Sequence, residues 1–134
     1  MDTVESHDPV AVVAAIYAAM AAHDLPGMIA LCHEDVVIDQ DPALPWGGHH
    51  VGHEGVTQFA VALMTNIASS VTTEALYLAG GTVVQFGRTA GNTIATGHPF
   101  DVHECHLWTI RESKAAAAHF LIDTASMLAA LSPG

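Results

Sequence analysis

Positive charge is scarce in this sequence. Three Lys and Arg residues stand against 14 Asp and Glu residues in a chain of 134, and the formal net charge at pH 7 is −11 with histidine counted as neutral. So few cations cannot neutralise a run of nucleic-acid phosphates or hold an anionic membrane surface. We therefore expect no nucleic-acid partner and no membrane partner.

Cysteine and long apolar runs are scarce as well. Cys32 and Cys105 are the only cysteines, and two cysteines make no disulfide framework, so both are expected as small buried hydrophobes. The longest apolar run, from Val10 to Ala22, is too short to span a bilayer. The acidic start from Met1 to Asp8 lacks the basic segment of a secretory signal, so a cytoplasmic protein is expected.

Hydrophobic residues and histidine, in contrast, are plentiful. Hydrophobic residues make up 51% of the chain, charged residues make up 13%, and ten residues are histidine. This composition is typical of a globular protein rather than a disordered one. The length suits a single domain that covers residues 1–134.

Apolar residues recur at helical spacing in the first half of the chain and at alternate positions in the second half. Asp8-Pro9 supplies an N-cap and a first-turn proline, whereas Gly80-Gly81 and Gly91-Asn92 are turn signals. The predicted elements are helices from Asp8 to about Ala22, from Asp24 to Leu31 and from His53 to Ala68; strands over Val36–Ile38, Val71–Ala79, Thr82–Thr89, Phe100–Arg111 and Ala115–Ile122; a loop from Asp41 to Gly52; and a closing helix over Ala125–Leu131, capped by Asp123. This order predicts an α+β domain.

The segment from Phe100 to Arg111 is the most informative for chemistry. In a strand its even-numbered residues share one apolar face, which should point toward the helices and carries Glu104 and His106 among large hydrophobes. Burial of a carboxylate is costly unless it is paired or protonated. Such a pair suits a general acid/base site in an apolar cavity. The alternative is a core Glu–His pair with no catalytic task.

Two further groups carry ionisable or aromatic residues. The first is the strand end at Asp39-Gln40-Asp41 with the following loop, whose Trp46, His49 and His50 could form the lip of a pocket. The alternative is a solvated turn, in which Asp41 before a proline is ordinary turn chemistry. The second group is His119 and Asp123, which share the odd-numbered face of the last strand.

Two of these candidate residues also have structural interpretations. Asp123 fits the N-cap of the closing helix. Tyr17 on the first helix could donate its hydroxyl into a cavity, or it could be a core residue with one satisfied hydroxyl.

Metal and cofactor motifs are not found. The loop histidines His49, His50 and His53, and the strand histidines His103 and His106, do not match the helical H-E-x-x-H pattern. The sequence contains no nucleophile-elbow, Walker A or dinucleotide-binding motif. We expect no dedicated metal site and no cofactor.

Several segments resemble ketosteroid isomerase-like proteins, among them Val12–Met20 and His23–Leu31. The loop Asp41–Val56, with its Pro-Trp-Gly-Gly run, resembles the SnoaL-like branch of that superfamily, as do His106–Arg111 and Asp123–Ala125. The resemblance covers nearly the whole chain. It implies the NTF2-like cone, a curved, mixed and mostly antiparallel sheet wrapped around three helices, with a short C-terminal helix and an apolar pocket at one end. It also implies a homodimer formed through the outer face of the sheet.

The resemblance further implies roles for individual residues. Ketosteroid isomerases use an Asp base and an oxyanion hole made of a Tyr and a protonated Asp. Asp41 is near the base position with a spacing one residue longer, Ile16 rather than Tyr17 takes the tyrosine's place, and His106 is at or near the second acid's place. SnoaL-like cyclases use an inward His on the long strand and an Asp on the last strand, to which His106 and Asp123 are the nearest matches.

These observations predict a small cofactor-independent enzyme, either an isomerase or a polyketide-cyclase-like enzyme. It would perform acid/base chemistry alpha to a carbonyl of a hydrophobic small molecule. The candidate catalytic residues are His106, Asp123, Asp41 and Glu104, and the candidate substrate-binding residues are Tyr17, Trp46, His49, His50, Phe59, Phe100, Trp108 and His119. The alternative is a non-catalytic ligand-binding or dimeric interaction module on the same fold.

Overall fold

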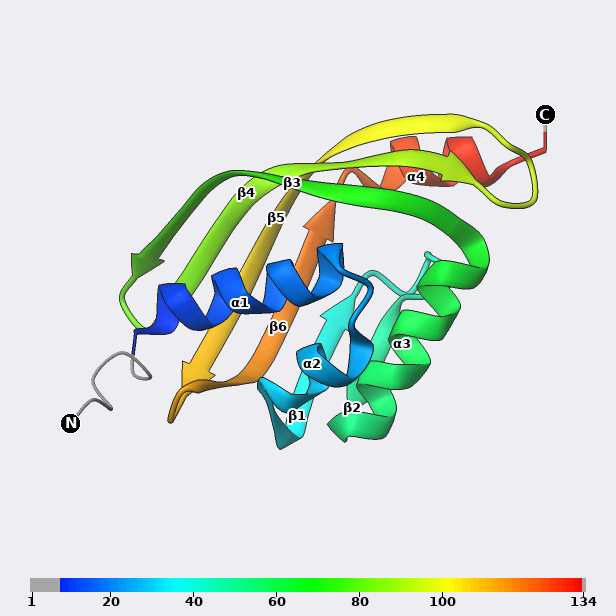
Figure 1. The fold of residues 1–134 in the computed structure, drawn as a ribbon. Coiled ribbons are helices and arrows are strands. Elements are labelled where there is room, and N and C mark those ends of the chain that lie inside the picture. Colours follow the sequence, from blue (N-terminus) through cyan, green and yellow to red (C-terminus); the bar gives the residue numbers. More distant parts are fainter. Residues whose placement is uncertain (1–7, 134) are drawn as a thin grey trace.

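The structure is a computed structural model that describes residues 8–133, and it shows one curved six-stranded sheet accompanied by helices (Figure 1). The elements in chain order are α1 (Pro9–Ala21), α2 (Leu25–Ala30), β1 (Cys32–Gln40), β2 (Gly48–Val51), α3 (Gly52–Asn66), β3 (Ile67–Ala79), β4 (Thr82–Thr93), β5 (Pro99–Arg111), β6 (Lys114–Ile122) and α4 (Thr124–Leu131). The strand order is β2-β1-β6-β5-β4-β3, and within residues 8–133 the β1–β6 pair alone is parallel. The α+β class and the curved mixed sheet are confirmed.

Three helices begin where the sequence places an aspartate. The Asp8 carboxylate accepts hydrogen bonds from the backbone N–H groups of Val10 and Ala11, at 3.0 and 3.4 Å. Asp24 accepts one from Gly27 at 2.9 Å, and Asp123 accepts one from Ser126 at 3.1 Å. Each bond satisfies a donor that the first helical turn leaves without a backbone partner, so the predicted N-caps are confirmed.

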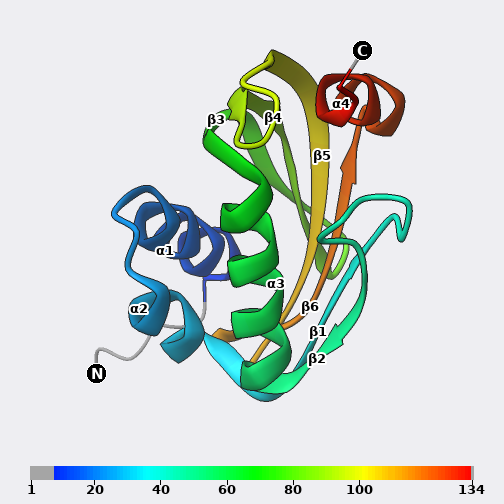
Figure 2. The same cartoon turned by 90° about the vertical axis from the view of Figure 1, so that its right-hand side faces the viewer.

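The core lies between the sheet and the helices α1, α2 and α3, which all lie on one side of the sheet (Figure 2). The buried apolar residues come from helices and strands alike and include Val13, Ile16, Met28, Val36, Ile38, Val56, Phe59, Val83, Trp108, Ala118, Phe120 and Met127. Helix α4 follows β6 and packs near the beginning of β5, at the top of Figure 1. None of the helices within residues 8–133 has both the length and the apolar character needed to cross a bilayer.

Two predictions between Asp41 and Ala68 are wrong. The expected loop holds β2, which pairs antiparallel with β1 from Val37 to Gln40. The third helix ends at Asn66, and Ile67 already pairs with Thr93 as the first residue of β3. Backbone pairing with a distant strand decides both boundaries, and an apolar spacing pattern carries no information about such pairing.

The predicted turn at Gly91-Asn92 is also wrong, because β4 continues through Thr93 and the chain reverses over residues 94–98. A Cβ atom on Gly91 would lie 2.0 Å from the Ala68 backbone oxygen. The glycine therefore allows β3 to approach β4 closely and does not make a turn. Strand β1 is longer than predicted, since the polar residues from His33 to Asp35 precede its apolar part.

Candidate active site

Strand β5 places two ionisable side chains inside the protein. The prediction from alternation is confirmed, because Glu104, His106 and Trp108 are all buried on the face that looks toward the helices. The whole Glu104 residue is 5% exposed and His106 is 6% exposed. At this depth every hydrogen bond, or the absence of one, changes the protonation behaviour of the two groups.

Hydrogen bonds and ring packing hold the His106 imidazole in place. The Tyr17 hydroxyl of α1 and His106 Nδ1 are 2.6 Å apart and share a hydrogen bond. The Trp108 indole Nε1–H donates to the same hydroxyl oxygen over 2.9 Å. The His106 ring also packs against Phe120, with 4.5 Å between the ring centroids. These contacts fix the ring, and its other nitrogen lies near Glu104.

Glu104 has one satisfied and one unsatisfied carboxylate oxygen. The Gln85 side-chain amide donates to Oε2 over 2.8 Å and also contacts the Thr73 hydroxyl at 3.2 Å. Glu104 Oε1 is 3.4 Å from His106 Nε2 and has no hydrogen-bond partner among residues 8–133. A buried oxygen without a partner is costly, so this atom is a candidate for contact with a ligand.

Burial shifts the pKa values of the site in the directions that favour neutral groups. It lowers the pKa of His106 to about 3, so the imidazole is neutral at physiological pH. It raises the pKa of Glu104 above its ordinary value, although the hydrogen bond from Gln85 opposes the shift. It also raises the pKa of the Tyr17 phenol, which therefore keeps its proton.

A cavity of about 480 Å³ lies above these groups, between the sheet and the helices. Its polar lining includes Tyr17, Glu104 and His106, with Gln40 and Thr89 nearby. Its apolar lining comes from α1, α2, α3, β3, β6 and the β1–β2 loop, and it includes Met20, Leu25, Met28, Trp46, Phe59, Leu63, Ile67, Phe120 and Ile122. A mostly apolar cavity with a few converging polar groups is the usual form of a small-molecule site.

The structure brings five of the predicted site residues together on this cavity, namely Tyr17, Trp46, Phe59, Glu104 and His106. Trp108 supports the site through its bond to the Tyr17 hydroxyl.

His50 holds the neighbouring loop at the cavity. Its Nε2 is 3.1 Å from the backbone oxygens of Trp46 and Gly47, and its ring meets Phe59 edge to face.

Five other expected residues do not reach this cavity. The Asp123 side chain is exposed and accepts hydrogen bonds from the Ser126 backbone and hydroxyl, which fits the helix cap and not a base. Asp41 is exposed and accepts from the Ala43 backbone. His49 is exposed and pairs with Asp39 at 2.6 Å. His119 is exposed on the opposite face of the sheet, since its neighbours Ala118 and Phe120 are buried.

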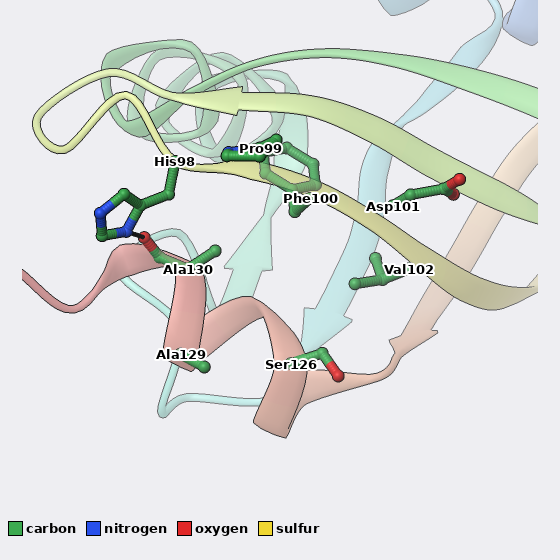
Figure 3. Close-up of a pocket in the computed structure, with 8 residues that line it drawn as sticks. All are labelled: His98, Pro99, Phe100, Asp101, Val102, Ser126, Ala129 and Ala130. Atoms are coloured by element: carbon green, nitrogen blue, oxygen red, sulfur yellow. Dashed lines mark hydrogen bonds between the residues drawn. The ribbon is translucent and has the colours of Figure 1, made fainter. Parts of the chain in front are cut away.

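Phe100 is the fifth, and it lines a different hollow. This second hollow, of about 430 Å³, lies between the beginning of β5 and α4 (Figure 3). His98 lies at its edge, where its Nδ1 is 3.0 Å from the Ala130 backbone oxygen. The hollow holds neither Glu104 nor His106.

Gln85 is the main site residue that is absent from the sequence-based prediction. It is fully buried on β4 and directly faces His106 across the β4–β5 pair. The available signal is that the polar Gln85 alternates with Val83 and Gly87, on the strand face that is buried. Among residues 8–133, no three or more His, Cys, Asp or Glu side chains are grouped so that they could hold a metal ion.

Comparisons with known proteins agree with this architecture. The SnoaL-like domain family matches residues 13–118. An NTF2-like protein from Burkholderia thailandensis is similar in structure, with a TM-score of 0.87, 25% identity, and coverage of 93% of this chain and 98% of that chain. None of the curated proteins matches the chain in sequence.

Two other solved structures contain small molecules. TerC, co-crystallised with polyporic acid, has a TM-score of 0.84 and 24% identity, and the alignment covers 91% of this chain and 96% of TerC. A protein from Catenulispora acidiphila with a ketosteroid isomerase-like fold, in complex with trimethylamine, has a TM-score of 0.77 and 21% identity, with 89% and 90% coverage. At these identities the likeness concerns the fold, and it confirms the NTF2-like and ketosteroid isomerase-like resemblance.

Proposed function

Because the chain belongs to the SnoaL-like domain family, we propose that it is a cofactor-independent enzyme that moves a proton alpha to a carbonyl of a hydrophobic small molecule. The observation that carries this proposal is the free, buried Glu104 Oε1 beside His106 Nε2 in an apolar cavity. The family contains small-molecule isomerases and cyclases, which supports chemistry of this class. The structure of TerC with polyporic acid supports a small organic ligand.

Glu104 is the base in this proposal. Burial raises the pKa of its carboxyl, and a carboxylate with a raised pKa is a stronger base at neutral pH than an exposed one. The Gln85 amide holds Oε2 and leaves Oε1 available to the ligand. The proton passes from the alpha carbon to Oε1, and the electron pair of the broken C–H bond moves into the enolate.

His106 stabilises the enolate oxygen as a neutral hydrogen-bond donor. A neutral imidazole polarises a carbonyl in the same way in triosephosphate isomerase, and burial keeps the pKa of His106 at about 3. The 3.4 Å between Nε2 and Glu104 Oε1 matches a substrate in which the carbonyl oxygen and the alpha proton are on adjacent carbons. One ligand can then contact both atoms at once.

The enolate has two possible uses that share this first step. If Glu104 returns the proton to another carbon of the conjugated system, the product is an isomer. If the enolate carbon attacks a second carbonyl of the same molecule, a carbon–carbon bond forms and closes a ring in an intramolecular aldol reaction, and Glu104 returns its proton to the alkoxide left by that carbonyl. The apolar lining excludes water from the enolate in either case.

The test measures exchange of alpha protons in deuterated buffer, with 2-tetralone as the probe ketone and NMR as the readout. We expect the wild-type protein to accelerate exchange and Glu104→Gln to lose about 100-fold or more of that acceleration. Glu34→Gln makes the same chemical change at an exposed position of β1 and should leave the rate unchanged. Wild-type protein that binds the ketone without exchange would identify a binding module and would contradict the proposal.

The proposal includes a homodimer formed through the face of the sheet that looks away from the helices. Leu121, Cys105 and Phe86 are register neighbours on β6, β5 and β4 of that face, and Tyr77 stacks on Phe86 with ring centroids 6.2 Å apart. Tyr77, Phe86 and Leu121 are each exposed by 44% or more. Large apolar side chains grouped on one exposed face are typical of an interface between proteins.

A further inference from the structure

The contacts beneath His106 have a direction that heavy-atom distances alone do not state. Trp108 Nε1 is 2.9 Å from the Tyr17 hydroxyl oxygen, which in turn is 2.6 Å from His106 Nδ1. An indole nitrogen donates and cannot accept, so the Tyr17 oxygen is the acceptor in the first of these bonds. Trp108 is 1% exposed, so no solvent competes for its N–H.

The second bond follows from the first. A phenol has one proton to donate, and among residues 8–133 the Tyr17 hydroxyl has hydrogen bonds only to Trp108 and His106. If His106 Nδ1 carried a proton, the Tyr17 oxygen would accept twice and its own proton would have no protein partner. The Tyr17 side chain is half-buried, and a donor there without a protein partner forgoes the hydrogen bond that Nδ1 offers at 2.6 Å. The Tyr17 proton therefore belongs on the bond to Nδ1, which then acts as the acceptor.

We propose that Trp108 and Tyr17 are positioning residues that hold His106 in the neutral tautomer with its proton on Nε2, directed toward Glu104 and the cavity. A neutral imidazole carries one N–H, so an acceptor role for Nδ1 leaves the proton on Nε2. That proton faces Glu104 Oε1 across 3.4 Å. The catalytic role of this Nε2 proton rests on the proposed function, whereas the tautomer is a property of the free protein.

This arrangement assigns Tyr17 a different task from a tyrosine that donates to the substrate oxygen. The Tyr17 proton is committed to His106 Nδ1, so His106 Nε2–H is the donor available to the ligand. Burial, which lowers the pKa of His106, keeps the ring neutral and makes its tautomer the relevant variable at physiological pH. Trp108, Tyr17 and His106 thus form a chain of two hydrogen bonds, which we call the relay. Tyr17 and His106 are 89 residues apart in the sequence, so the tertiary fold creates this relay.

The experiment is two-dimensional NMR of the ligand-free protein with 15N-labelled histidine, which separates protonated from unprotonated ring nitrogens. In the wild type we expect His106 to show a protonated Nε2 and an unprotonated Nδ1. In Tyr17→Phe the ratio of the two tautomers should fall roughly fivefold toward the Nδ1–H form, the effect of losing one hydrogen bond. In Trp108→Phe it should move in the same direction, because the Tyr17 oxygen regains a free acceptor site.

Trp46→Phe is the matched control. Like Trp108→Phe, it replaces a buried indole by a phenyl ring, here at a residue that lines the cavity. It leaves the hydrogen bonds of the relay in place, so the wild-type tautomer should persist. A wild-type His106 with its proton on Nδ1 would overturn the proposal without any variant. An unchanged tautomer ratio in Tyr17→Phe would overturn it too.

These outcomes are separate from those of the proposed function. Ketone exchange by a wild-type protein whose His106 proton is on Nδ1 would reject the relay and keep the enzyme. An Nε2–H tautomer in a protein that exchanges no ketone would keep the relay and reject the enzyme.

Discussion

Burial acts on Glu104 and His106 in opposite directions along the pH scale. The pKa of Glu104 is raised in the folded state, so the group supports folding at low pH and this support is lost as pH rises through its folded pKa. The pKa of His106 is lowered from 6.5 to about 3, so its support is full above about pH 6.5 and is lost as pH falls toward 3. At neutral pH the free-energy cost of burying an ionisable group therefore falls on Glu104 and not on His106.

We predict that Glu104→Gln stabilises the protein while it removes the proposed base. The amide keeps an acceptor for the Gln85 amide and removes the buried charge. We expect a gain on the order of 1 kcal/mol in the free energy of unfolding at about pH 8, a typical stability–activity exchange. The gain should shrink at about pH 5, where the wild-type carboxyl is closer to protonation. Urea unfolding followed by circular dichroism measures both values.

Glu34→Gln is again the control, since it neutralises an exposed carboxylate of β1 and should change the stability little at either pH. An equal loss of stability in Glu104→Gln at both pH values would contradict the assignment of a costly carboxylate. It would indicate instead that Glu104 is a satisfied structural residue.

At the scale of elements, Gly87 connects the sheet to the site. Strand β3 has a register shift between Thr73 and Ala75, opposite Gly87 and Phe86 of β4. A Cβ atom on Gly87 would lie 2.1 Å from the Thr72 backbone oxygen and 2.7 Å from Gln85 Nε2. The absence of a side chain thus allows β3 to approach and leaves room for the amide that holds Glu104.

Gly87→Ala is therefore expected to lower the free energy of unfolding by about 2 kcal/mol or more. It should also slow ketone exchange, because the Gln85 amide is displaced from Glu104 Oε2. The control is Gly81→Ala in the β3–β4 turn, where a Cβ atom would have no neighbour within 4 Å. Denaturant midpoints and exchange rates of the two variants give the comparison, and equal stability of the two would refute the packing role of Gly87.

How much the sequence predicts differs from element to element. The long strand β5 was predicted almost to its ends, because alternation over many residues has one simple interpretation. Strand β2 was missed, since its two histidines follow glycines in a segment that resembles a loop. The turn predicted at Gly91 is wrong because, in sequence, a glycine that allows a neighbouring strand to approach closely looks the same as a glycine that makes a turn.

In the site, too, the residues placed by the pattern of one strand are predicted, and the contacts made between distant segments are not. The inward pair Glu104 and His106 follows from the period of one strand. The Gln85 contact depends on the register of β4 against β5, and the Tyr17 contact depends on how α1 crosses the sheet, so neither follows from local pattern. Asp123 had two sequence interpretations, and in the structure its side chain caps α4.

At the scale of the whole molecule, the net charge opposes the homodimer that the exposed apolar face favours. Each chain carries a formal charge of −11, so two copies repel each other over distances that salt shortens. The apolar group on the outer face, Tyr77, Phe86 and Leu121, supplies the attraction. Since burial of apolar surface depends little on salt and repulsion depends on it strongly, salt should strengthen the dimer.

The last prediction follows from this balance. Sedimentation equilibrium should show a dimer whose dissociation constant falls as sodium chloride rises from about 0.05 to about 0.5 M, because the Debye length shortens over that range. Phe86→Ser should weaken the dimer roughly tenfold or more, as expected for a central aromatic residue of an interface. Val61→Ser changes an exposed apolar residue of α3, on the other side of the sheet, and should leave the dimer intact. A protein that stays monomeric at all salt concentrations, or a dimer that salt dissociates, would reject an apolar interface on this face.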